Sequence, residues 1–209
     1  IGVTGVQTCA LPISGPPPTA RSPLRSSRVP TNRNIEFKAE LRDLDLARAI
    51  ARRIGARHVG QLAQTDTYFK LPQGRLKRRQ SDAEPPEYIL YSRADDARPR
   101  VSEFTIFSEP DAFARFGTLG MPPWVTVKKL RDVFLLDFVR IHLDQVERLG
   151  RFIEFEALVL PQHNAGRCHR DIQRLRADFG PVLGEPVSAS YSDLIAAEAP
   201  LPEAGLPPG

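Results

Sequence analysis

The protein chain has 209 residues, of which 41% are hydrophobic and 26% charged, and its formal net charge is +4. Two cysteines are too few for a disulfide framework or a thiolate metal cluster, and no apolar run approaches the roughly 18 residues of a membrane-spanning helix. The composition therefore predicts a cytoplasmic protein with no membrane association.

Residues 1–30 are interpreted as lying outside the folded domain. Residues 3–13 resemble the translation of a sequencing-adapter oligonucleotide, and residues 14–30 are rich in Pro, Ser and Arg without periodicity. A secretory signal would need a positive first region and a longer apolar core. The three arginines of this segment account for most of the net charge, so the remaining chain carries +1 and predicts no specific nucleic-acid partner. Residues 31–196 form one domain, and we expect residues 197–209 to be a disordered tail.

The first half of the domain alternates one helix with several strands. A strand is predicted at about 33–41, followed by a helix to about 54 with Asp43 as its N-cap. Its apolar face is expected to contain Leu46, Ile50 and Ile54. Strands follow at 64–69, 75–80, 88–93 and 101–107.

The second half continues in the same way. Pro110 opens a short helix to about Leu119, whose predicted apolar stripe contains Ala112, Phe113 and Phe116. Strands are expected at 124–131, 132–138, 139–147 and 151–160. The last helix, at about 164–179, places Cys168 on its apolar side, where a packing role suits a lone thiol.

Most of these strands have one apolar and one charged face. In the first strand, Ile35 and Phe37 point to one side and Glu36 to the other, and the same pattern returns at 152–157. Because the helices need an apolar surface to pack on, the charged faces are expected to point inward. We therefore predict an α+β fold: a closed, antiparallel, eight-stranded β-tunnel with a charged lumen and about three helices packed outside. Such a lumen suits a strongly anionic ligand together with metal ions.

Several segments resemble the CYTH domain family, the triphosphate tunnel metalloenzymes. The resemblance covers about residues 32–195 and lies in segments 33–39, 64–69, 74–77, 127–131, 140–146, 149–156 and 190–194. The family includes class IV adenylyl cyclases, thiamine triphosphatases and inorganic triphosphatases. Its eight-stranded tunnel binds a triphosphate with Lys and Arg, and a divalent cation with carboxylates.

The resemblance implies roles for particular side chains. The implied ligands of Mg²⁺ or Mn²⁺ are Glu36, Asp144, Glu154 and Glu156, of which Asp144 could instead position a water molecule. The implied substrate-binding residues are Lys38, Lys77, Arg79, Arg93, Lys129, Arg131 and Arg140. Catalytic roles are implied for Lys38, Arg140 and Asp144. Hard divalent cations prefer oxygen ligands, and a phosphate chain needs several cations placed in advance, so this division is chemically consistent.

Three positions leave alternatives open. The family signature is Glu-x-Glu-x-Lys, and here Asn34 stands at its first position, where the amide could supply a metal-ligand oxygen or hydrogen-bond a neighbouring strand at the tunnel rim. His142 shares a face with Arg140 and Asp144 and could be structural or catalytic. Asp66 belongs to a family motif in which it could simply fix the geometry of its strand.

Three functions fit this resemblance. The first is a metal-dependent hydrolase of tripolyphosphate, a nucleoside triphosphate or thiamine triphosphate. The second is a class IV adenylyl cyclase, and the third is a non-enzymatic module that binds polyphosphate or nucleotides. No motif here reads adenine, which favours the hydrolase over the cyclase. The implied partner is a small molecule that contains a triphosphate, and a homodimer is compatible with the family.

Overall fold

The structure, a computed structural model, describes residues 31–72, 74–82, 84–92, 100–117 and 120–198. The predicted N-terminal segment 1–30, nearly all of the predicted tail, and Arg93 lie outside the described residues. Among the helices in the described ranges, none is long and apolar enough to cross a membrane.

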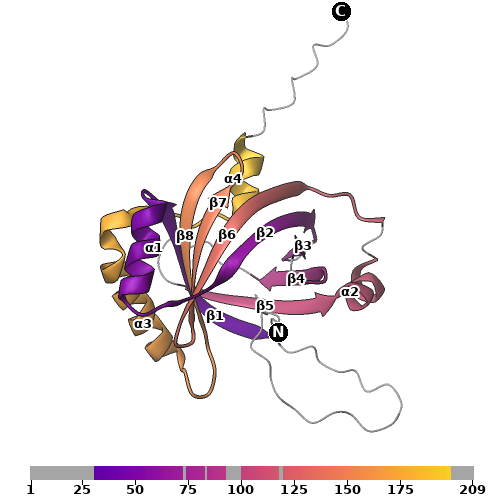
Figure 1. The fold of residues 1–209 in the computed structure, drawn as a ribbon. Coiled ribbons are helices and arrows are strands. Elements are labelled where there is room, and N and C mark those ends of the chain that lie inside the picture. Colours follow the sequence, from indigo (N-terminus) through magenta and orange to yellow (C-terminus); the bar gives the residue numbers. More distant parts are fainter. Residues whose placement is uncertain (1–30, 73, 83, 93–99, 118–119, 199–209) are drawn as a thin grey trace, which may run out of the picture.

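The described residues form nine strands, four α-helices and one short 3-10 helix (Figure 1). The elements are β1 (Asn32–Leu41), α1 (Leu44–Arg53), β2 (Arg57–Lys70), β3 (Arg75–Ser81), β4 (Glu87–Ser92), β5 (Arg100–Ser108), α2 (Glu109–Phe116), β6 (Val125–Leu136), β7 (Val139–Val146), β8 (Gly150–Leu158), α3 (Ala165–Asp178), η2 (Gly180–Val182), β9 (Leu183–Pro186) and α4 (Tyr191–Glu198).

Eight of the strands close into an antiparallel barrel. They pair in the order β5-β4-β3-β2-β6-β7-β8-β1, and β5 also pairs with β1, which removes both edges of the sheet. The short β9 adds to the end of β1, at Ala39 and Leu41. The predicted closed barrel of eight antiparallel strands is confirmed.

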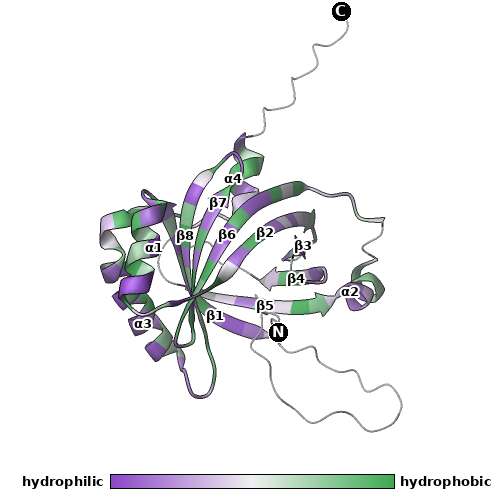
Figure 2. Cartoon of the chain, viewed as in Figure 1, coloured by the Kyte–Doolittle hydropathy of each residue, from purple (hydrophilic) through white to green (hydrophobic). Residues whose placement is uncertain are grey.

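The outer face of β1, β7 and β8 is apolar and carries two of the helices. Ile35 and Phe37 of β1 join Ile153 and Phe155 of β8 in one buried cluster with the inner faces of α1 and α3. The rings of Phe37 and Phe155 stack with their centroids 5.9 Å apart. The strands in Figure 2 change repeatedly between hydrophilic and hydrophobic residues along their length, as expected for strands with two different faces.

The other two helices lie elsewhere on the barrel. Helix α2 packs its Ala112 against outward residues of β3, β4 and β5, and α4 packs Tyr191 and Ile195 against Val127 and Phe152. In Figure 1, α2 lies on the opposite side of the barrel from α1 and α3, while α4 lies beside β7 and β8. Four helices are therefore present where about three were predicted, and β9 and α4 were not predicted as elements.

Some predicted boundaries and faces were wrong. The predicted strands 124–131 and 132–138 form one strand, β6, because the chain turns only at Asp137, whose φ is 52°. Strand β2 begins at Arg57, seven residues before the predicted start, where it pairs with the far end of β6.

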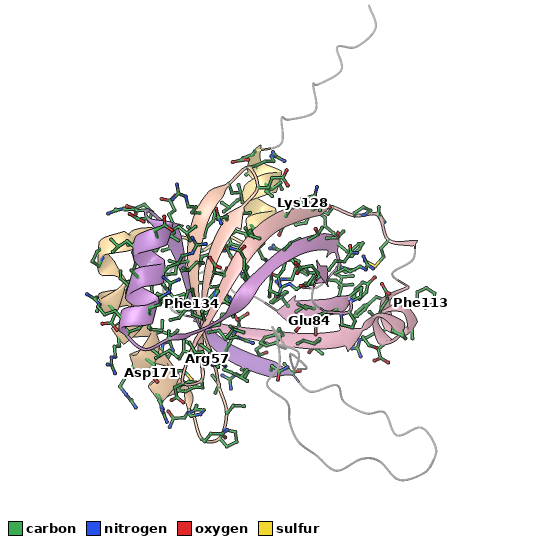
Figure 3. The ribbon with its side chains drawn as sticks, viewed as in Figure 1. Arg57, Glu84, Phe113, Lys128, Phe134 and Asp171 are labelled. Carbon is green, nitrogen blue, oxygen red and sulfur yellow. The ribbon has the colours of Figure 1, made fainter. Side chains whose placement is uncertain are left out.

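Two residues predicted to be buried in helical stripes face solvent. Leu46 and Phe113 are each 45% exposed. In α1 the buried face contains Leu44, Ala47, Ile50 and Ala51, since the small alanines let the helix approach the sheet closely. Figure 3 shows Phe113 on the outside of α2, pointing away from the strands.

Candidate active site

One cavity of about 240 Å³ lies inside the barrel, and all eight barrel strands contribute to its lining. Nine of the residues named by the family resemblance line it: Glu36, Lys38, Lys77, Arg79, Lys129, Arg131, Arg140, Glu154 and Glu156. Strand periodicity explains this arrangement, because residues two apart on one strand share a face. Glu154 and Glu156 thus point inward, while Phe155 between them is completely buried in the outer core.

A fully buried carboxylate, that of Asp66 on β2, holds the cations on one side of the cavity. Arg79 donates two hydrogen bonds to it, at 2.9 and 3.0 Å, and Lys129 Nζ lies 2.8 Å from Asp66 Oδ2. Lys77 Nζ lies 3.3 Å from the same oxygen. Burial would raise the pKa of Asp66, but the charges of Arg79, Lys129 and Lys77 hold that pKa well below its usual value.

Asp66 therefore acts as a counter-ion that gathers three cations into one cluster. The sequence left the role of Asp66 open, with strand geometry as one alternative. The signal that could have found the cluster is the alternation of Gln64, Asp66 and Tyr68, which places the carboxylate on the inward face of β2.

The charge of Lys129, a member of this cluster, depends on its burial. Its side chain is almost completely buried, and burial lowers the pKa of Lys129 to about 8, although Asp66 opposes the shift. At neutral pH the ammonium group is still protonated, so the cluster has its full positive charge there.

A second cluster is centred on Arg131 of β6. Its guanidinium donates to both carboxylate oxygens of Asp144, each at 2.6 Å, and to Glu154 Oε2 at 2.6 Å. The hydroxyl group of Tyr191 donates to Asp144 Oδ2 at 2.9 Å. Asp144 is fully buried and is not among the residues that line the cavity. In this arrangement the two carboxylate oxygens of Asp144 orient Arg131. They do not face the cavity, where a carboxylate that binds a metal directly would be expected.

The carboxylates of β8 form the part of the cavity that fits a divalent cation. Glu154, Glu156 and His142 each offer a ligand atom, and the three atoms lie within 4.8 Å of one another. Glu36 is the cross-strand partner of Glu156, so a third carboxylate lines the same region. His142 Nδ1 is buried, has no hydrogen-bond partner among the described residues, and lies 3.7 Å from Glu156 Oε1.

The protonation states of these groups also suit a metal. Burial opposes ionisation of both glutamates, but Arg131 holds the pKa of Glu154 well below its usual value, and His142 in its protonated form and Arg140 lower the pKa of Glu156. Burial and the charge of Arg131 lower the pKa of His142. Deprotonated carboxylates and a neutral imidazole are the forms that coordinate a cation.

Helix α4 closes against one part of the site. Lys38 Nζ donates to the carbonyl oxygen of Ala189 at 2.5 Å and lies 4.4 Å from the ring centroid of Tyr191. Arg75, which also lines the cavity, donates to Ser190 Oγ at 2.5 Å and to Asp193 Oδ2 at 2.9 Å. The start of α4 therefore binds two cations of the barrel directly.

Asn34 lines the cavity and is only 4% exposed. Its Oδ1 atom has no hydrogen-bond partner among the described residues. The amide oxygen is therefore not used to bond a neighbouring strand, which was one of the two alternatives for this position.

Comparison with known proteins agrees with this architecture. The sequence profile of the CYTH domain matches residues 32–174. The chain belongs to the CYTH domain family. No curated protein matches the chain.

Several solved structures have the same fold. This CYTH protein is similar to the PH1012 protein of Pyrococcus horikoshii OT3, with 23% identity and a TM-score of 0.63, over 77% of this chain and 98% of that one. A candidate adenylate cyclase from Vibrio parahaemolyticus has 19% identity and a TM-score of 0.62, over 78% of this chain and 97% of its own.

A plant protein extends the comparison. The candidate adenylyl cyclase HpAC1 of Hippeastrum, which has a dominant triphosphatase activity, is 14% identical with a TM-score of 0.56. The match covers 82% of this chain and 98% of that protein. At these identities the likeness establishes the shared fold.

Proposed function

We propose that this CYTH protein is a metal-dependent enzyme that hydrolyses an inorganic or organic triphosphate inside its barrel. The observation that carries the proposal is the set of charged side chains that line the cavity. Seven Lys or Arg side chains and three glutamates line it: Lys38, Arg75, Lys77, Arg79, Lys129, Arg131, Arg140, Glu36, Glu154 and Glu156. The cations match the charge of a phosphate chain, and the glutamates match a divalent cation.

The cations are placed before any ligand arrives. Asp66 holds Lys77, Arg79 and Lys129 together, and Asp144 orients Arg131. Charges that are fixed in advance need no reorganisation when negative charge develops on the phosphate oxygens, and this preorganisation is the main source of catalysis in phosphoryl transfer. Arg140, paired with Glu156 at 3.1 Å, and Lys38 are proposed to contact the phosphoryl group that is transferred.

Glu36, Glu154 and Glu156 are proposed to hold Mg²⁺ or Mn²⁺. When bound, such a cation would neutralise charge on the phosphate oxygens and favour attack by water at phosphorus. The carboxylates are proposed to orient that water, and the buried cations to hold the leaving phosphate.

The test is a substrate panel with Mg²⁺ and with Mn²⁺. Tripolyphosphate, ATP and thiamine triphosphate are incubated with the protein, and phosphate, pyrophosphate and cyclic AMP are measured separately. Release of phosphate that requires a divalent cation and is lost in Glu156→Gln supports the proposal. Formation of cyclic AMP and pyrophosphate from ATP would contradict the hydrolase and favour the adenylyl cyclase. Binding of a triphosphate without any turnover would favour a binding module.

A further inference from the structure

The part of the cavity wall formed by β4 and β5 differs from the rest. Among the described residues that line the cavity, β4 contributes Ile89 and Tyr91, and β5 contributes Ser102 and Phe104. None of these four side chains is charged. β2 contributes one uncharged residue, Tyr68, and the other five strands each contribute at least one ionised side chain. In the described lining, β4 and β5 are therefore the only two neighbouring strands that both lack a charged side chain.

The aromatic pair lies directly beside the cationic part of the cavity. Tyr91 and Phe104 are cross-strand partners, and their ring centroids are 6.4 Å apart with a tilt of 39°. Lys77 Nζ, which belongs to the Asp66 cluster, lies 5.1 Å from the centroid of the Tyr91 ring. The uncharged wall therefore begins where the phosphate-binding cations end.

A pair of unsatisfied polar groups continues the same wall. Asn34 and Ser102 are cross-strand partners that are 4% and 1% exposed. Asn34 Oδ1 and Ser102 Oγ have no hydrogen-bond partner among the described residues, and both residues line the cavity. Buried polar atoms without partners are costly, and a ligand with hydrogen-bonding groups would satisfy them. Since Ser102 and Phe104 are two residues apart on one strand, the polar pair and the aromatic pair share a face.

We propose that Asn34, Tyr91, Ser102 and Phe104 form a subsite for a planar, polar ring attached to the triphosphate. This inference rests on the proposed function and makes it more specific, because the substrate would be an organic triphosphate rather than inorganic tripolyphosphate. The ring would stack on Tyr91 or Phe104, and its polar edge would bond Asn34 and Ser102. The phosphates would extend from there past Lys77 into the cationic cavity.

The experiment compares kcat/KM for substrates with and without a ring. The ring-bearing substrates are ATP, UTP and thiamine triphosphate, and the ring-free ones are methyl triphosphate and tripolyphosphate. We expect at least one ring-bearing substrate to exceed methyl triphosphate by about tenfold or more, which is the usual size of a stacking contribution. Tyr91→Leu should reduce that preference to about one, and Ser102→Ala should weaken it.

The matched control is Tyr88→Leu. Tyr88 is on the same strand but points into the outer core beside α2, so its replacement should leave the preference for a ring unchanged. Tripolyphosphate turnover without any preference for a ring in the parent protein would overturn the subsite while leaving the proposed function intact. Equal losses for all substrates in Tyr91→Leu would also overturn it.

If no triphosphate is turned over, the proposed function fails, and calorimetry then decides the subsite. Tighter binding of any of the three ring-bearing triphosphates than of methyl triphosphate, lost in Tyr91→Leu, would support it. Equal binding of all these probes would overturn it.

Discussion

At the scale of single residues, the cavity depends on buried carboxylates that neutralise cations before a ligand binds. Asp66 is the clearest case, since three cations surround it and its side chain is 1% exposed. Removing one partner from a buried ion pair leaves the other charges uncompensated, at a cost of about 3–5 kcal/mol. An anion that binds in the cavity would supply the missing charge.

We therefore expect Asp66→Asn to be strongly destabilised in urea unfolding, and tripolyphosphate to restore part of the loss. The matched control is Asp132→Asn. Asp132 is also buried and pairs with Arg48 at 2.5 Å, but it lies on the outer side of β6 beneath α1. Its variant should be destabilised without rescue by tripolyphosphate. Equal rescue of both variants would mean that the anion does not act through the Asp66 cluster.

A second residue-scale prediction concerns pH. Lys129 has a pKa of about 8 in the folded protein because its side chain is buried. Below that pH the ammonium group is charged and attracts phosphate. As the pH rises through about 8 the charge is lost, so tripolyphosphate affinity measured in EDTA should fall by about fivefold or more between pH 7.5 and 9.5.

Lys129→Arg provides the comparison for this pH profile, because a guanidinium stays charged throughout the range. Its affinity should vary less with pH than that of the parent protein. Identical pH profiles for the two proteins would show that another group controls the binding of the anion.

At the scale of elements, α4 links the end of the chain to the cavity. Ser190 caps the helix, since its Oγ accepts from Asp193 N at 3.1 Å while Asp193 Oδ2 accepts from Ser190 N at 3.2 Å. Ser190→Ala should cost about 1 kcal/mol of unfolding free energy, as for other lost caps. It should also raise KM for the triphosphate, because Arg75 loses a bond that fixes its position.

The comparison is with Ser108→Ala. Ser108 caps α2 by accepting from Asp111 N at 3.3 Å, and α2 packs against β3, β4 and β5 in a cluster that contains no residue of α4. A similar loss of stability with no change in KM is expected there. If Ser190→Ala also left KM unchanged, α4 would have a purely structural role.

Element type was predictable from the sequence where periodicity was strong. β1 and β8 were predictable because charged and apolar residues alternate over their whole length, and α3 because its apolar face repeats over four turns. No turn signal lies inside β6, and the break predicted at 131–132 was wrong. α4 was missed because an eight-residue helix with mixed polarity has no clear periodicity; its stability comes from packing on Val127 and Phe152.

At the scale of the whole molecule, the inward and outward faces of the strands have separate tasks. Nine of the charged residues that line the cavity could be predicted because strand periodicity and the family resemblance agreed. Their partners were harder to predict. Asp66 and Lys129 lie on β2 and β6, which are far apart in the sequence and pair only in the folded barrel. Arg131 and Asp144 face each other across the β6–β7 hairpin, which the break predicted at 131–132 obscured.

Two adjacent residues of β8 test this separation of faces. Phe155 is completely buried against the rings of Phe37 and Phe179, with centroids 5.9 and 5.3 Å away. Phe155→Ala should lower the free energy of unfolding by about 3–5 kcal/mol, because it leaves a large cavity in the outer core. The fraction that remains folded should keep its activity per molecule.

Glu154→Gln should lower activity while leaving most of the stability. The glutamine keeps the volume of the side chain and an oxygen that can accept from Arg131, which also retains both bonds to Asp144. We expect the free energy of unfolding of this variant to lie within about 2 kcal/mol of that of the parent protein, since only one charge of the network is removed. Metal-dependent turnover should fall by about a hundredfold or more, because a proposed cation ligand has lost its charge.

The two variants, Phe155→Ala and Glu154→Gln, are compared by urea unfolding and by turnover normalised to the folded fraction. Full normalised turnover in Glu154→Gln would exclude Glu154 from the metal site, whereas a stability loss as large as that of Phe155→Ala would show that the inner face also holds the barrel together.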